Sequence, residues 1–464
     1  MQVNFNNDKK ANLVKFAYKN QTDNPYFKAD LGEILPNPSE NTILLGLGEK
    51  DKLDKESFKK AIYKLAKSAI KLDLDELSFE KENIDTEDNE FLSQIIEAVS
   101  LANYNFDYYK EEKSGKIENI NFPEDLDDED LDDENSNAIP EQLTVLDSQA
   151  FARDLVNLRS NDIYPESLAQ ATKERLTRNV EVKIYDEKQI KDLGLTAYLE
   201  VGKGSDNPPR FIVMEYLNGP KEQKPLVFVG KGITYDSGGY SIKPSNGMKT
   251  MNADMGGAGT VIGAMDAISS NELKVNVIGI VAACENSISG RSYKPGDVIT
   301  ARNGLTIEVD NTDAEGRITL ADAVNYGVTE YDPEFIVDLA TLTGACLVAL
   351  AETYTGAVTN DQETFEKVLA AAKEADEKIW QLPNDDTIRK YNESEVADVK
   401  NSGGRLGGTI TAGQFIENFI EEKPWVHLDI AGTAYLSKSQ GLYEKGATGV
   451  HVKTLYNLAK SYSK

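Results

Sequence analysis

The amino-acid sequence predicts an α/β protein with a small N-terminal domain and a larger second domain. Three observations support this fold class. The chain has 464 residues, too many for one ordinary domain, and its 40% hydrophobic residues suffice for a sizeable core. Apolar runs of strand length alternate with amphipathic helical stretches along most of the chain. A strongly acidic segment, residues 124–134, interrupts this alternation.

The first 135 residues are predicted to form the small α/β domain. The run NTILLGLG (41–48) is typical of a buried strand, and the stretches 55–72 and 88–104 have helical periodicity. The segment 124–134 is acidic at all but two positions, so like-charge repulsion predicts an exposed, extended loop at the end of the domain. A metal-binding role for this loop is the alternative.

The second domain, residues 161–464, is predicted to follow a linker helix within 136–160. Five apolar runs are typical of buried strands, namely 225–230, 275–284, 305–309, 334–341 and 425–432. Helical stretches lie between them at 256–268, 317–331 and 411–422. This alternation predicts a mostly parallel sheet covered by helices on both faces. Ligands bind such sheets beyond the carboxyl ends of the strands, where we expect the functional residues.

Composition excludes several classes of function. The formal net charge of −28 repels nucleic acid and anionic lipid, so neither partner is expected. No apolar run could span a bilayer, and the start of the sequence lacks the apolar core of a signal peptide. Cys284 and Cys346 lie in apolar runs and are expected to be buried free thiols of a reduced, cytoplasmic compartment.

The chain has only two histidines, so any metal site must be built mainly from carboxylates. His427 lies on a predicted buried strand and is expected to be a hydrogen-bonded structural residue. His451 is expected near the surface, at the start of the final helix.

A glycine-rich segment, Val229–Gly259, carries Lys231, Asp236, Lys243 and Asp254. Its GKG lacks the glycine and hydroxyl residue of a phosphate-binding loop. Its DSGG has no histidine upstream, and no G-x-S-x-G elbow occurs in the chain. Serine nucleophile chemistry is therefore not expected, and the charged side chains remain to be explained.

The heptapeptide NTDAEGR, Asn311–Arg317, places Asp313, Glu315 and Arg317 at every-other spacing. In an extended segment this spacing directs the two carboxylates to one side. Taken singly, each residue is also explained by turn chemistry or by capping of a helix that begins near 317. Four carboxylates that converge without a cation would be very costly, whereas two divalent cations require them. Together with two lysines and an arginine they predict metal-assisted hydrolysis with Mg²⁺, Mn²⁺ or Zn²⁺.

These segments resemble the leucyl (cytosol) aminopeptidases. The resemblance rests on VGKGITYDSGG (229–239), MNADMGGA (251–258) and above all NTDAEGR, and it continues through ATLTGA (340–345) to WVHLDIAGTA (425–434). It covers about residues 150–464, and the N-terminal third shows no matching motif. The resemblance implies the family's two-domain α/β fold and a homohexamer. It also implies an exopeptidase that acts on peptides with a free N-terminus, whose α-amino group would ligate one metal ion.

The resemblance also assigns roles. Five residues match the ligands of two divalent metal ions, namely Lys231, Asp236, Asp254, Asp313 and Glu315. Asp236 and Glu315 are expected to bridge both ions, with a metal-bridging water as the nucleophile. Lys243 matches the lysine that polarises the scissile carbonyl. Arg317 matches the arginine that holds a bicarbonate ion, which acts as general base.

Five further residues match positions that contact the substrate, namely Met251, Asn311, Thr341, Leu342 and Gly344. Met251 and Thr341 would form an apolar slot that favours Leu or Met at the N-terminus. Tyr240 replaces a usually aliphatic residue of the family, which affects the pocket shape or a subunit contact.

The alternatives to an aminopeptidase of this kind are a dipeptidase-like relative acting on very short peptides, a DNA-binding protein and a non-catalytic scaffold. The net charge argues against DNA binding, and the intact motifs argue against a scaffold.

Overall fold

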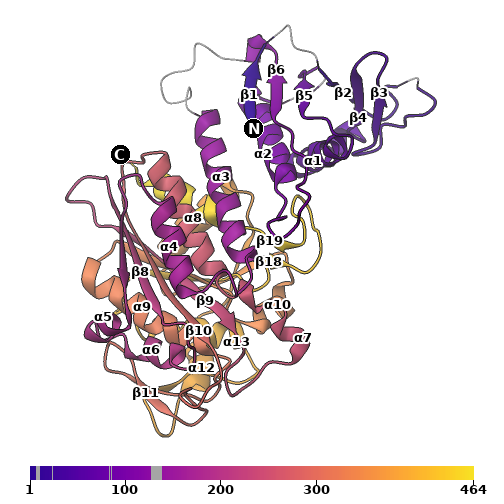
Figure 1. The fold of residues 1–464 in the computed structure, drawn as a ribbon. Coiled ribbons are helices and arrows are strands. Elements are labelled where there is room, and N and C mark those ends of the chain that lie inside the picture. Colours follow the sequence, from indigo (N-terminus) through magenta and orange to yellow (C-terminus); the bar gives the residue numbers. More distant parts are fainter. Residues whose placement is uncertain (7–10, 23, 83, 85, 127–137, 464) are drawn as a thin grey trace. The chain divides into compact units, whose positions relative to one another are not determined.

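The chain forms two compact units (Figure 1). Its computed structural model describes residues 1–6, 11–22, 24–82, 84, 86–126 and 138–463. Unit 1 consists of Met1–Leu146 and Lys438–Lys445, and unit 2 consists of Asp147–Ser437 and Gly446–Lys464. The boundary falls inside helix α3 (Ala138–Asn157), in the region expected to form a linker helix. Most of the acidic segment, residues 127–134, lies outside the described residues.

Unit 1 contains a six-stranded sheet in the order β1-β6-β5-β2-β4-β3, whose described pairs are parallel except β3–β4. The strands are β1 (Gln2–Phe5), β2 (Leu13–Ala17), β3 (Ile34–Asn37), β4 (Thr42–Gly46), β5 (Glu76–Phe79) and β6 (Asn119–Phe122). The helical segments are η1 (Lys50–Lys52), α1 (Lys55–Lys71), α2 (Asp88–Asn103) and η2 (Glu124–Leu126). Helix α1 begins where the Asp54 carboxylate accepts a hydrogen bond from the Ser57 amide at 2.8 Å.

The core of unit 1 is aromatic and aliphatic. Phe16, Phe58, Phe79, Phe91 and Phe122 contact one another with ring centroids 5.7–6.5 Å apart. The segment Lys438–Lys445 adds to this unit late in the sequence. Its Leu442 and Tyr443 pack against the core, and its Glu444 carboxylate accepts a hydrogen bond from the Tyr63 hydroxyl at 3.0 Å.

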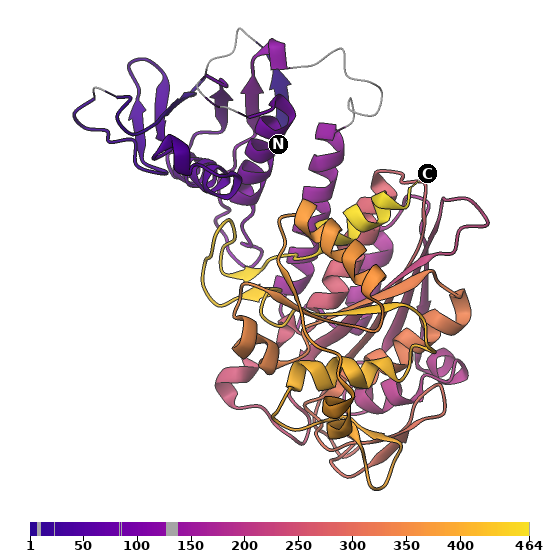
Figure 2. The same cartoon turned by 180° about the vertical axis from the view of Figure 1, so that it is seen from behind.

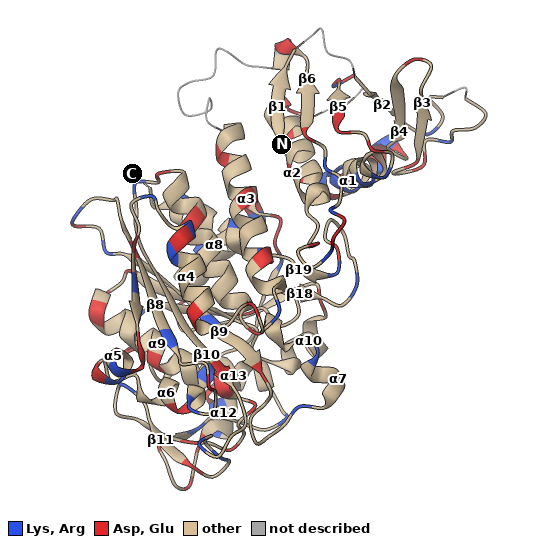
Figure 3. Cartoon of the chain, viewed as in Figure 1, with Lys and Arg blue, Asp and Glu red and all other residues tan. Residues whose placement is uncertain are grey.

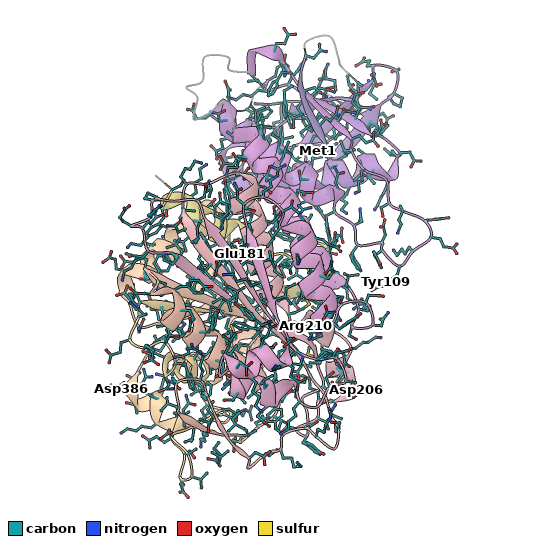
Figure 4. All side chains as sticks on the ribbon, turned by 60° about the vertical axis from the view of Figure 1, so that its left-hand side comes forward. Met1, Tyr109, Glu181, Asp206, Arg210 and Asp386 are labelled. Carbon is teal, nitrogen blue, oxygen red and sulfur yellow. The ribbon has the colours of Figure 1, made fainter. Side chains whose placement is uncertain are left out.

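Unit 2 contains an eight-stranded sheet in the order β15-β14-β17-β13-β9-β10-β8-β7. Its four central strands run parallel, namely β17 (Trp425–Asp429), β13 (Phe335–Ala340), β9 (Leu226–Asp236) and β10 (Asn276–Asn286). On one edge, β8 (Arg210–Leu217) and β7 (Glu181–Tyr185) pair antiparallel, so Glu181 and Arg210 lie at opposite ends of the pair (Figure 4). On the other edge, β14 (Thr355–Thr359) is antiparallel to β17, and β15 (Ile379–Gln381) is parallel to β14.

Helices cover both faces of this sheet, as predicted (Figures 1 and 2). On one face α8 (Gly256–Ser270) packs on β9, β10 and β13, and α14 (Val452–Ser461) packs against α8. On the other face α9 (Glu315–Tyr331) packs on the same strands, flanked by α6 (Thr196–Gly202) and α13 (Gly408–Glu417). The other helices of unit 2 are α4 (Pro165–Arg175), α5 (Glu187–Asp192), α7 (Ser245–Met248), η3 (Met251–Ala253), α10 (Gly344–Leu350), α11 (Gln362–Glu374), α12 (Asp386–Arg389) and η4 (Lys390–Asn392).

One predicted strand of the main sheet is wrong. The run at 305–309 forms β12 (Thr306–Glu308) of a separate three-stranded sheet with β11 (Val298–Thr300) and β16 (Val399–Lys400). Only the middle residue of β12, Ile307, is buried. Such alternation suits a small sheet with one face toward solvent, whereas the central parallel strands are buried on both faces. The strands β18 (Tyr435–Leu436) and β19 (Gly446–Ala447) pair antiparallel in unit 2.

The structure tests the expectations for cysteine and histidine. Cys284 and Cys346 are buried free thiols, as expected. His427 is fully buried with its Nδ1 2.7 Å from Asp338 Oδ1, which confirms the expected structural hydrogen bond. His451 does precede the final helix, but its expected surface position is wrong because its ring is turned into the core, 2.7 Å from Thr355 Oγ1. No helix of the described residues is long and apolar enough to cross a membrane.

Candidate metal centre

The predicted site residues gather at the carboxyl ends of the central parallel strands. The predicted ligand Asp236 is the last residue of β9, and the predicted substrate contact Thr341 directly follows β13. Asp429, which was not predicted as a site residue, ends β17. Asn286 ends β10. The edge of the sheet at which ligands of parallel sheets bind therefore carries the charged cluster.

Strand β9 carries two predicted ligands, which corrects the prediction that the strand ends before Lys231. It continues to Asp236, so both residues belong to the strand. Lys231 Nζ lies 2.7 Å from Asp254 Oδ2 and 2.9 Å from Glu315 Oε1. Its stem passes Gly316, where an added Cβ would lie 2.4 Å from Lys231 Cε. Gly316 of the NTDAEGR motif therefore makes room for the lysine.

The loop after β9 turns back toward the strand. Gly238 and Gly239 have φ values of +84° and +60°, a region that favours glycine. After this turn Lys243 Nζ lies 2.7 Å from Asp236 Oδ2 and 2.5 Å from Asp313 Oδ1. The Lys243 ammonium group therefore joins a carboxylate of β9 to one that precedes α9.

The NTDAEGR segment is not the extended strand that its spacing predicted. Asp313 lies in a turn, in which its amide donates to Asn311 Oδ1 at 2.8 Å, and Glu315 and Arg317 lie in the first turn of α9. Two residues apart on a helix means about 200° around its axis, so Glu315 and Arg317 do not share one face. Glu315 reaches Lys231, while the buried Arg317 has an Nε without a hydrogen-bond partner among the described residues.

The carboxylates of this cluster repel one another. One ligand oxygen from each of Asp236, Asp313 and Glu315 lies within 4.8 Å of the others. Burial, and then the Asp236 charge, raises the pKa of Glu315 to about 8. Burial also raises the pKa of Asp254 to about 6, against the effect of Lys231. Burial and the Asp236 charge raise the pKa of Asp313 in the same way. Elsewhere, as on α4, acidic and basic residues stand close together along the ribbon (Figure 3).

The two lysines are held as cations. Burial lowers the pKa of Lys231, but the Asp254 and Glu315 charges outweigh this effect and raise it above its usual value. The pKa of Lys243 is raised in the same way, mainly by Asp236. Even so, two ammonium groups do not balance four carboxylates.

The donor set fits divalent metal ions. Carboxylate oxygens are the ligands that Mg²⁺ and Mn²⁺ prefer and that Zn²⁺ also accepts. Glu315 Oε2 is buried and has no hydrogen-bond partner in the described part of the chain. Burial and the Asp236 charge raise the pKa of Asp254 and of Glu315, and the four carboxylates outnumber the two ammonium groups, so the cluster has a deficit of positive charge. Additional cations at the three clustered carboxylates would remove that deficit.

The predicted substrate-contact residues lie on segments that carry or adjoin members of this cluster. Thr341 Oγ1 donates to Asp254 Oδ1 at 2.9 Å, and its carbonyl accepts from Lys231 Nζ at 2.9 Å. Leu342 and Gly344 follow in the same loop, and Gly344 is exposed at the start of α10. Asn311 shapes the turn before α9 through its bond to the Asp313 amide, and the half-buried Met251 opens the short helix η3, which ends next to Asp254.

Sequence reasoning missed two polar residues of the site. Asn286 Nδ2 donates to Asp236 Oδ1 at 2.8 Å and to the Thr312 carbonyl at 2.9 Å, so it joins the two ligand-bearing segments. Asn401 Nδ2 donates to the Asn311 carbonyl at 2.6 Å. An asparagine two residues after the apolar run 275–284 was the signal for Asn286, whereas Asn401 lies in a segment with no distinctive pattern.

Comparison with known proteins covers both units. The model of the "Cytosol aminopeptidase family, catalytic domain" matches residues 150–456, and that of the family's N-terminal domain matches residues 29–113. The second match lies where the sequence motifs showed no resemblance. A probable cytosol aminopeptidase of Clostridium tetani is 43% identical over an alignment of 465 positions, which covers 99% of this chain and 96% of the relative.

Another relative and a solved structure also match nearly the whole chain. A probable cytosol aminopeptidase of Aquifex aeolicus is 42% identical over 436 residues, covering 92% of this chain and 87% of the relative. Among solved structures, the bottromycin maturation enzyme BotP in complex with Mn superposes with a TM-score of 0.88 at 28% identity. That superposition covers 98% of this chain and 100% of BotP.

Proposed function

This chain belongs to the cytosol aminopeptidase family of metal-dependent aminopeptidases, and we propose that it is a leucyl aminopeptidase that removes Leu- or Met-like N-terminal residues. The observation that carries the proposal is the convergence of four carboxylates with Lys231 and Lys243 at the carboxyl edge of the sheet. The nearby side chains of Met251, Thr341 and Leu342 are uncharged, which supports an apolar first residue.

The proposed centre holds two divalent metal ions, with Mn²⁺, Zn²⁺ and Mg²⁺ as candidates. The solved BotP complex contains Mn, which supports Mn²⁺ as the first ion to test. Asp236 and Glu315 would bind both ions, and Asp313 would bind one of them. Asp254 and Lys231 would bind the other, with Lys231 as a neutral amine after the metal has displaced its proton. When bound, such ions supply Lewis acidity and lower the pKa of a water molecule.

The chain's own cations have separate tasks in this proposal. Lys243 is held by Asp236 and Asp313, so its ammonium group can stabilise negative charge that develops on the scissile carbonyl oxygen. Arg317 is buried and its Nε has no partner in the described part of the chain, which supports its role in holding bicarbonate. A bicarbonate there would supply the general base.

The proposal also includes partners and location. The substrates are peptides with a free N-terminus, and the net charge of −28 supports the absence of nucleic acid and membrane partners. We propose a homohexamer on the basis of the family resemblance. A cytoplasmic location is supported by two buried free thiols and by the names of the relatives.

The test is hydrolysis of leucine amide and of N-acetyl-leucine amide by protein stripped with a chelator and then given Mn²⁺, Zn²⁺ or Mg²⁺. Cleavage of the free amine alone, restored by metal and absent in Asp236→Ala, is the expected result. Leucyl peptides of two to six residues separate a general aminopeptidase from one restricted to very short peptides. Cleavage of the acetylated substrate, or full activity in the stripped protein, would contradict the proposal.

A further inference from the structure

We propose that Asp429 is a positioning residue for the aminopeptidase reaction. Its buried carboxylate holds the loop 341–344 beside the metal centre and thereby sets the fit of the substrate's first side chain. This inference rests on the proposed function, because the loop carries three of the predicted substrate contacts. None of the roles derived above from motifs belongs to Asp429.

The Asp429 carboxylate forms most of its hydrogen bonds with this loop. It is fully buried at the end of β17. Its Oδ2 accepts a hydrogen bond from Thr343 Oγ1 at 2.6 Å. Its Oδ1 accepts from the amides of Leu342 at 3.3 Å, Thr343 at 3.4 Å and Ala431 at 3.2 Å. Three of the four donors therefore belong to two consecutive residues of the loop, and one anchors the chain that leaves β17.

The Thr343 hydroxyl connects Asp429 to two helices. Its hydroxyl accepts a hydrogen bond from the Cys346 amide at 3.0 Å and so caps the start of α10. The same oxygen lies 3.0 Å from Thr409 Oγ1, in the first turn of α13. The direction in which the loop enters α10 is thus fixed by one hydroxyl that Asp429 orients.

The other end of the loop is tied to the metal centre. Thr341 bonds to Lys231 through its carbonyl and to Asp254 through its hydroxyl, each at 2.9 Å. The loop is therefore held between two predicted metal ligands and a carboxylate that is not one of them. A displacement of about 1 Å can cost about 10²-fold in rate when reacting groups must be aligned, so this second anchor matters for catalysis.

The test compares two isosteric changes on neighbouring strands. Asp429→Asn is the variant of interest, and Asp338→Asn on β13 is its control. Asp338 is equally buried, but its carboxylate bonds to His427 and Trp425 instead of the loop. For each protein, kcat and KM are measured with leucine, methionine and alanine amides, and Tm is measured with Mn²⁺ present.

Asp429→Asn is expected to raise KM for leucine amide about tenfold and to reduce the preference for leucine over alanine. Asp338→Asn is expected to lower Tm while KM and the leucine preference stay within about twofold of wild type. Unchanged KM and preference in Asp429→Asn would overturn the inference. So would equal kinetic losses in both variants, because Asp429 would then act only through stability.

A second pair of variants keeps the inference testable if Asp429→Asn does not fold. Thr343→Ser retains the hydroxyl that donates to Asp429, and Thr343→Val removes it at similar volume. Thr343→Val is expected to show the same changes in KM and leucine preference as Asp429→Asn. Thr343→Ser is expected to keep the wild-type values of both. Identical kinetics in the two variants would overturn the inference. An inactive wild type would overturn the proposed function as well, whereas a leucine-selective wild type with unaffected variants would overturn this inference alone.

Discussion

Two glutamates of unit 2 with buried side chains have opposite surroundings. Glu315 lies among carboxylates. Its Oε1 pairs with Lys231, but its Oε2 has no hydrogen-bond partner in the described residues. Glu377 accepts hydrogen bonds from the His451 amide at 2.8 Å and from the Thr454 amide and hydroxyl at 3.2 and 2.5 Å. Burial dominates at Glu315 and raises its pKa to about 8. At Glu377 burial is outweighed by hydrogen bonding and charge from His451, so its pKa is lowered.

The difference shows how a structural carboxylate is distinguished from a ligand. Both side chains are buried, so burial alone does not separate them. The hydrogen-bond donors around each carboxylate make the difference, because a carboxylate surrounded by donors is stable as an anion within the fold. A carboxylate whose neighbours are also acidic needs a cation from outside the chain. Four measurements on two variants test this contrast.

The largest expected effect is on activity. Glu315→Gln should reduce kcat/KM for leucine amide by about 10³-fold, because it removes a charge that the proposed metal centre requires. Glu377→Gln, the matched change at the other glutamate, should stay within about threefold of wild type. Steady-state kinetics at saturating Mn²⁺ measure both. Comparable losses in the two variants would break the contrast.

The next effect is stabilisation by metal. At Mn²⁺ concentrations about 100 times the Kd, the free energy of unfolding of the stripped wild type should rise by about 2.7 kcal/mol. The same increase is expected for Glu377→Gln and should be absent in Glu315→Gln. Thermal unfolding with and without Mn²⁺ measures it. An equal increase in Glu315→Gln would show that Glu315 is not a ligand.

Without metal, the two variants are expected to change the free energy of unfolding by smaller amounts and in opposite directions. Glu377→Gln should lower the free energy of unfolding by about 2 kcal/mol, because charge-assisted hydrogen bonds are lost. Glu315→Gln should raise it by about 1 kcal/mol, because Glu315 is ionised in the unfolded chain, whereas burial and the nearby carboxylates disfavour its ionised form in the fold. Urea unfolding in the presence of a chelator measures both values. The contrast fails if both variants shift stability in the same direction.

The smallest effect is on the acid side of the stability profile. The pKa of Glu377 in the fold lies below its ordinary value of 4.5. Its contribution to stability is therefore fully present above pH 4.5 and is lost as the pH falls through the lower folded value. The stability difference between wild type and Glu377→Gln should shrink below that pH. A difference that stays constant down to about pH 3 would contradict this.

The central strands of unit 2 were predictable because strands buried on both faces are continuous apolar runs. The runs that predicted β9, β10, β13 and β17 are of this kind. The short edge strand β14 contains threonine and glycine and gives no such signal. Strand β12 was placed in the wrong sheet because a short alternating run does not specify its partners.

The site was predictable in composition but not in geometry. Carboxylate and lysine side chains after strands indicated a cluster, and the structure brings Asp236, Asp254, Asp313 and Glu315 together. The every-other spacing of NTDAEGR suggested an extended segment, because two-residue spacing does not distinguish a strand from a turn that starts a helix. Asp429 gave no signal, since its role depends on a loop nearly 90 residues away in sequence.

The return of segment Lys438–Lys445 to unit 1 has a consequence for synthesis on the ribosome. N-terminal domains generally fold first while the rest of the chain is still being made. Here the last contacts of unit 1, such as the hydrogen bond from Tyr63 to Glu444, become available only when nearly the whole chain has been translated. Unit 1 therefore completes its native contacts at the end of translation, and no single cut in the chain separates the two units intact.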